Sequence, residues 1–177
     1  MHTLSKTSIQ GAVSFACGLY FALLQMSYFL LLEAHLSSQS LSYFIALFFW
    51  LCGLLLGLNI RAGRRFFSVL LGVGVASYYV AWSLARWAPF HALLYPATAI
   101  CAAISGTLPG FFFGFIGERY KPIRRPLLHE NNGFIVGIFI SLKGAIHFGD
   151  ILLALGPALG AALVALALLA WRGDAEA

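Results

Sequence analysis

The chain has 177 residues, of which 61% are hydrophobic and only 10% are charged, and its mean hydropathy is +0.89. Because soluble domains are about 25% charged, this composition excludes an ordinary soluble protein and favours an integral membrane protein. The formal net charge of +5 does not indicate nucleic-acid binding, since the basic residues lie beside apolar segments and form no basic helix or tail.

Six apolar segments reach or approach the length of about 20 residues that a membrane-spanning helix needs. The first is too long for a signal-peptide core, so we expect an uncleaved helix. Only Phe148, Gly149 and Asp150 separate the fifth from the sixth, which fits a tight hairpin. An alternative with five spans makes the fifth segment re-entrant. The sequence predicts an all-α transmembrane bundle, a single domain over 1–177, with spans at 9–32, 39–60, 66–88, 91–117, 131–148 and 150–171.

Basic residues alternate between the breaks that separate these segments. Arg86 and Lys143 lie at one set of breaks, and the other nine lie at the other set. Since basic loops stay in the cytoplasm, we expect six spans with both termini cytoplasmic, in the bacterial cytoplasmic membrane. The expected partners are lipid and either further copies or other membrane subunits. The nine residues are Lys6, Arg61, Arg64, Arg65, Arg119, Lys121, Arg124, Arg125 and Arg172.

Four segments carry two glycines that are four residues apart. This spacing puts both glycines on one helix face and lets a neighbouring backbone approach closely. We expect them to form contacts between the protein's own helices, with dimerisation or a sliding transport interface as the alternative. The pairs are Gly53 and Gly57, Gly110 and Gly114, Gly133 and Gly137, and Gly156 and Gly160.

Ionisable residues gather near the predicted outer ends of the spans. Such groups are costly near hydrocarbon and are usually paired, so we expect Lys143, the deepest of them, to pair with Glu33 or Asp150. Three histidines in this set offer ligands for haem, a pigment or a metal. Their spacing matches no tight site, so no metal or cofactor is assigned. The outer set is Glu33, His35, Arg86, His91, Lys143, His147 and Asp150.

A second charged set lies at the predicted inner side, and we expect it to latch the fourth and fifth helices together as a structural network. No acid is evident inside a span. The inner set is Arg61, Arg64, Arg65, Glu118, Arg119, Arg124, Arg125 and Glu130.

Two family resemblances follow from these motifs. Gly114, Glu118 and Arg119 resemble the glycine–acid–arginine part of a loop in major-facilitator transporters, which implies half of such a transporter. The stretches from Phe49 to Gly57 and from Glu130 to Gly137 are similar to the membrane region of spermidine-synthase-like proteins, as are Gly18 with Ala22 to Gln25 and Gly156 to Gly160. This second resemblance implies a fold but no enzyme activity, because the aminopropyltransferase domain is missing.

The sequence contains no hydrolase, zinc-protease or P-loop motif and no paired carboxylates at catalytic spacing, so we expect no enzyme. A scaffold or accessory subunit of a larger membrane assembly is the favoured function. The first alternative is a transporter-like homodimer of six-helix halves that moves a small solute. The second is a haem- or pigment-binding subunit that uses His35, His91 or His147.

Overall fold

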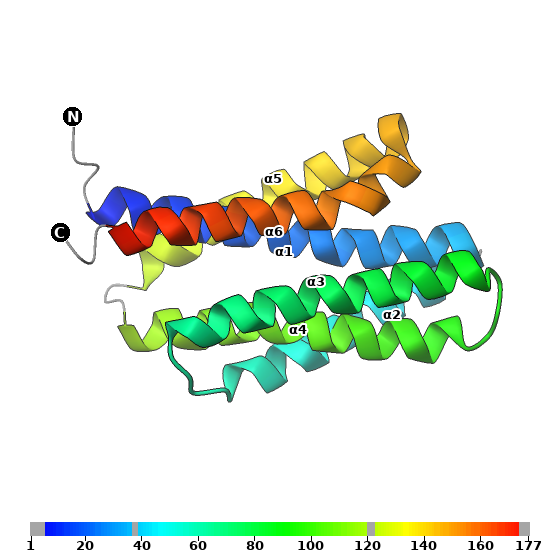
Figure 1. Cartoon of the computed structure of the whole chain (residues 1–177), viewed down its shortest axis with the longest axis horizontal. Coiled ribbons are helices and arrows are strands. Elements are labelled where there is room, and N and C mark those ends of the chain that lie inside the picture. The colour runs from blue at the N-terminus through cyan, green and yellow to red at the C-terminus, as the bar shows by residue number, and fades with distance from the viewer. Residues whose placement is uncertain (1–5, 37–38, 120–122, 174–177) are drawn as a thin grey trace.

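A computed structural model describes residues 6–36, 39–119 and 123–173, and the side chains of 10–36, 40–117 and 123–171. Within these ranges the chain forms six helices and no strand, so the predicted all-α fold is confirmed (Figure 1). The helices are α1 (Lys6–Leu36), α2 (Gln39–Leu58), α3 (Arg64–Trp87), α4 (Leu94–Arg119), α5 (Arg124–Phe148) and α6 (Asp150–Gly173).

Five of the six helices are long and apolar enough to cross a membrane, as expected of an integral membrane protein. The exception is α5, whose 25 residues include Arg124, Arg125, Glu130 and Lys143. At 1.5 Å per residue, α5 is about 37 Å long, so its polar residues and not its length set it apart.

The start of α5 differs from the prediction. We expected a span from residue 131, with the preceding charged residues in a loop, but the helix begins at Arg124. Pro126 is the third residue of the helix, and the first turn tolerates proline because its N–H groups have no acceptor within the helix. His129 and Glu130 therefore lie on the helix.

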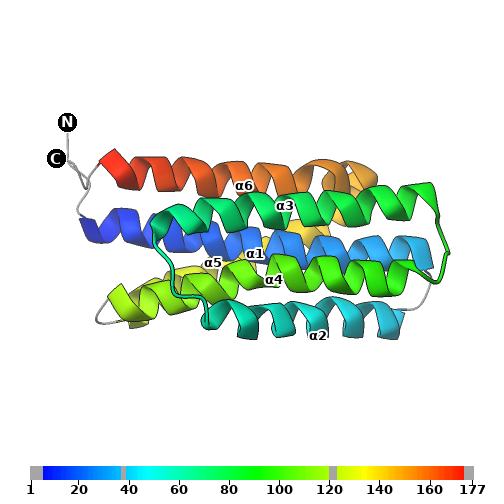
Figure 2. The same cartoon turned by 60° about the horizontal axis from the view of Figure 1, so that its bottom comes forward.

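The six helices form two groups of three, and each group has one central helix. One central helix, α1, packs against α5 and α6, and the other, α4, packs against α2 and α3. Figures 1 and 2 show the helices side by side, with the start of α1 and the end of α6 at the same end of the bundle. That end carries Arg61, Arg64, Arg65, Arg124 and Arg125 and is called the basic end; the other is the far end.

Glycines bring two helix pairs into direct backbone contact. A methyl group added at Gly53 would overlap the carbonyl oxygen of Ala103, and one added at Gly133 would overlap that of Phe15. Any larger residue at these positions therefore forces α2 away from α4 or α5 away from α1. Gly57 and Gly110 take part in the α2–α4 contact, and Gly137 takes part in the α1–α5 contact.

The other predicted glycines pack less closely. Gly114 lies 3.4 Å, measured from its added methyl carbon, from the carbonyl oxygen of Leu58. Gly160 faces the ring of Tyr20 on α1, while Gly156 faces Leu152 of its own helix. The tightest helix contacts are thus those of α2 with α4 and of α1 with α5.

The α1–α5 contact and the α2–α4 contact use glycines and carbonyls at corresponding positions. Gly18 of α1 lies against the carbonyl of Glu130, and Gly106 of α4 lies against the carbonyl of Trp50. Glu130 and Trp50 each stand three residues before the first glycine of a Gly-x-x-x-Gly pair, on α5 and on α2. Because α4 runs in the direction opposite to α1, the segments α1–α3 and α4–α6 form an inverted repeat.

We predict that Gly133→Ala lowers the unfolding temperature, because the added methyl group overlaps the α1 backbone. The expected loss in stability is about 1–3 kcal/mol, measured as loss of the helical circular dichroism signal on heating in mild detergent.

Gly72→Ala is the matched control, since a methyl group there meets nothing within 4 Å while helix propensity improves equally. Equal unfolding temperatures for the two variants would contradict the close contact.

Candidate functional site

Glu130 is the only charged residue with a buried side chain among those that the structure describes, with 4% of its surface exposed. It shares one face of α5 with Pro126, Gly133 and Gly137, and this face packs against α1. Because α5 is already helical at Arg124, the helical period turns residue 130 toward the bundle. Glu130 thus faces α1, and its predicted role in a latch between α4 and α5 stays a prediction.

Burial raises the pKa of the Glu130 carboxyl to about 7, because a low-dielectric environment disfavours the charged form of an acid. The residue lies just before the apolar stretch 131–148. The buried thiol of Cys17 on α1 is close enough to interact electrostatically with the Glu130 carboxyl. A carboxyl with a pKa of about 7 is divided between its neutral and charged forms at neutral pH, whereas an ordinary surface glutamate is charged.

The basic residues of the predicted latch lie at one end of the bundle. Arg61, Arg65, Arg124 and Arg125 are exposed. Arg64 instead turns inward and donates a hydrogen bond of 2.7 Å to the carbonyl oxygen of Leu168. The side chains of Glu118 and Arg119 lie outside the described residues.

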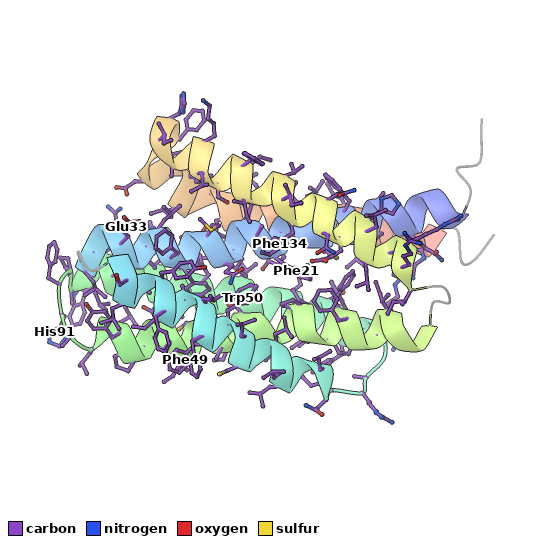
Figure 3. The ribbon with its side chains drawn as sticks, turned by 180° about the vertical axis from the view of Figure 1, so that it is seen from behind. Phe21, Glu33, Phe49, Trp50, His91 and Phe134 are labelled. Atoms are coloured by element: carbon purple, nitrogen blue, oxygen red, sulfur yellow. The ribbon has the colours of Figure 1, made fainter. Side chains whose placement is uncertain are left out.

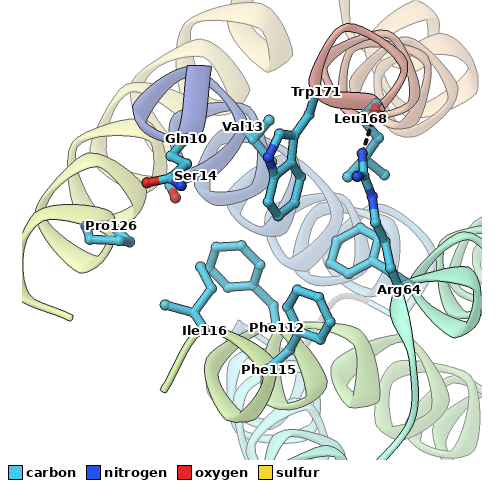
Figure 4. Close-up of a pocket in the computed structure, with 11 residues that line it drawn as sticks. Gln10, Val13, Ser14, Arg64, Phe112, Phe115, Ile116, Pro126, Leu168 and Trp171 are labelled. Atoms are coloured by element: carbon cyan, nitrogen blue, oxygen red, sulfur yellow. Dashed lines mark hydrogen bonds between the residues drawn. The ribbon is translucent and has the colours of Figure 1, made fainter. Parts of the chain in front are cut away.

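Arg64 links α3 to α6 at the basic end. Its guanidinium carbon lies 4.3 Å from the ring centre of Trp171, a cation–π contact. Figure 4 shows both residues at a cavity that Gln10, Ser14 and Pro126 also line. The cavity measures about 20 Å³, which is room for a single water molecule.

Buried hydroxyl groups join helices in the middle of the bundle. Ser105 donates a hydrogen bond of 3.0 Å to the carbonyl oxygen of Gly74. Since a serine hydroxyl has one hydrogen, Tyr28 donates the 2.9 Å bond that connects it to Ser105. The hydroxyl of Tyr20 has no hydrogen-bond partner among the described residues.

Two further tyrosines join α3 to α6. Tyr78 donates a hydrogen bond of 2.8 Å to the carbonyl oxygen of Leu153, and Tyr79 donates one of 2.7 Å to that of Ala154. These hydrogen bonds were not predicted from the sequence. The available signal was the position of these tyrosines inside apolar spans, because tyrosine in membrane proteins is enriched at the interfaces.

The polar residues at the far end form pairs that differ from the prediction. Asp150 lies 3.7 Å from Arg86 in an exposed ion pair, so it is not the partner of Lys143. Lys143 lies on the exposed side of α5. Figure 3 places Glu33, which is half-buried, and His91 at this same end. Among the described residues, the ion pair of Asp150 is with Arg86 and not with the expected Lys143.

The three histidines of this set are held by backbone groups. His35 and His147 each bond through Nδ1 to the carbonyl oxygen four residues earlier, at 2.9 Å in both cases. His91 accepts a 3.2 Å bond at Nδ1 from the backbone N–H of Leu93. No group of three or more potential metal ligands is found among the described residues.

No protein-family model matches this chain, and no match to it was found among curated proteins or solved structures. The two family resemblances therefore stay predictions from sequence motifs.

We predict that stability falls as the pH rises from about 4.5 to about 7. The folded state keeps the Glu130 proton up to pH about 7, whereas an unfolded glutamate loses it near 4.3. The folded state thus binds more protons across this window, and each pH unit costs stability.

Glu130→Gln mimics the neutral acid and should remove most of this decline, on the order of 2 kcal/mol. Unfolding temperatures measured in detergent from pH 4.5 to pH 8 test this prediction. Glu33→Gln is the control, because Glu33 is less buried and lies at the far end of α1. A Glu130→Gln profile that matches the Glu33→Gln profile contradicts the prediction.

Proposed function

We propose that this chain is a non-enzymatic subunit of a larger membrane assembly and serves it as a rigid helical scaffold. The observation that carries this proposal is the filled interior. The cavity at the basic end has room for only about one water molecule, and the glycine contacts bring helix backbones together. This packing supports a role in assembly, because the cavity is too small for a solute larger than water.

The outer surface of the bundle also supports assembly. Large apolar side chains cover the exposed faces of α2 and α5, among them Phe44, Leu55, Phe139 and Ile146. Within the bilayer such faces meet either lipid or the helices of other subunits. From the alternation of basic residues, we place the basic end in the cytoplasm of a bacterial cell and the bundle in the cytoplasmic membrane.

A second candidate function is a carrier for a small solute that works as a homodimer of six-helix halves. Two observations favour it. The inverted repeat is an arrangement from which many transporters are built, and it agrees with the half-transporter resemblance. Glu130 supplies a buried acid whose proton exchanges near pH 7, as proton coupling requires. In this candidate the path lies between two copies.

We predict that the tagged chain, extracted from its own membranes in mild detergent after brief cross-linking, co-purifies with other membrane proteins in fixed stoichiometry. Native mass spectrometry of the complex measures the subunits and their numbers.

The carrier candidate predicts a homodimer without other subunits. It also predicts solute uptake into liposomes driven by a pH gradient, lost in Glu130→Gln and kept in Glu33→Gln. A stable solitary monomer that drives no uptake would contradict both candidates.

A further inference from the structure

A lateral groove of about 570 Å³ lies between α3 and α6, in the half of the bundle toward the basic end. The buried residues Leu71 and Leu168 line it. Apart from Arg64, Val75 and Leu169, the rest of the lining consists of small residues that are largely exposed, so the groove opens on the outer surface of the bundle, where lipid lies. These residues are Ser68, Gly72, Ala76, Ala161, Ala162 and Ala165.

A fixed positive charge stands at one end of this groove. Arg64 lines both the groove and the water-sized cavity of Figure 4. The hydrogen bond to Leu168 and the stacking on Trp171 hold its guanidinium in place. The residue also begins α3, whose N-cap Gly63 provides no side-chain cap, and the helix dipole adds positive potential there.

The dimensions of the groove fit one leaflet of a bilayer. From Arg64 to Ala76 the helix rises about 18 Å at 1.5 Å per residue, which is close to half of the roughly 30 Å hydrocarbon core. The groove is thus mostly apolar along its length and cationic at one end. An amphiphile with an anionic head and a hydrocarbon tail complements both features.

We infer that this groove binds one anionic phospholipid from the leaflet at the basic end. An acyl chain lies between α3 and α6, and the phosphate lies against the guanidinium of Arg64. The site is independent of both functions proposed above, because it requires neither a partner subunit nor solute movement.

Two variants test the two halves of the site. Gly72→Phe fills the groove, and the backbone can accept it because a Cβ atom added there meets nothing within 4 Å. Val69→Phe is its control, on the same helix at a 54% exposed position outside the groove. Arg64→Gln removes the charge, and Arg125→Gln, exposed at the same end on α5, is the control.

The measurement is native mass spectrometry of the full chain, titrated with phosphatidylglycerol or with phosphatidylcholine that has identical acyl chains. The unaltered chain, Val69→Phe and Arg125→Gln should bind the first phosphatidylglycerol about fivefold more tightly than phosphatidylcholine, as expected for one basic side chain at a headgroup. Arg64→Gln should lose this preference, and Gly72→Phe should lose the tight first binding event for both lipids.

Several results would overturn the inference. They are equal lipid binding by Gly72→Phe and Val69→Phe, an unchanged preference in Arg64→Gln, or dissociation of a dimer by Gly72→Phe, which would make the occupant a second copy. If Arg64→Gln does not fold, Arg64→Lys keeps the charge and should keep the preference. If Gly72→Phe does not fold, Gly72→Leu narrows the groove and should weaken binding of both lipids. A loss of the lipid preference in Arg64→Lys, or unchanged lipid binding in Gly72→Leu, counts against the site.

Discussion

Direct backbone contact at glycine residues is the interaction on which the rest of this bundle depends. Lipid is as apolar as a leucine side chain, so helices in a membrane associate through close packing and hydrogen bonds, with no hydrophobic driving force between them. Gly53 and Gly133 remove the side chains that would separate α2 from α4 and α5 from α1. These contacts fix the register of each pair and make α1 and α4 the centre of the fold.

The seam between α3 and α6 is built differently. Glycine does not bring these two helices together, and hydrogen bonds connect them at separate points: Tyr78 and Tyr79 near the middle and Arg64 near the basic end. Each such bond contributes about 1 kcal/mol in a membrane protein. Between these points the small residues leave the groove open. Two tightly packed helix pairs are thus combined with one seam that has room for an amphiphile.

Hydropathy predicted the existence of the six helices, but α5 begins earlier than expected and is the one helix that is not apolar enough to count as a span among the described residues. Glycine spacing marked most of the residues at the closest contacts but missed Gly18 and Gly106. The burial of Glu130 was missed because its polar neighbours resemble a loop, and only the start of α5 at Arg124 turns the side chain inward. The partners of Tyr78 and Tyr79 are backbone carbonyls, which no sequence motif identifies.

Glu130 is an exception within the inverted repeat, because it places an ionisable side chain at a buried position that is apolar in the other half. Its equivalent in the other half is Trp50, which is buried to a similar degree, 3% against 4% exposed, beside a glycine contact of the same kind. A large apolar side chain therefore suits this place, and a carboxyl there loses hydration. A scaffold gains nothing from that loss, whereas a proton-coupled carrier requires such a group. The choice between the two proposed functions therefore rests on the proton of Glu130.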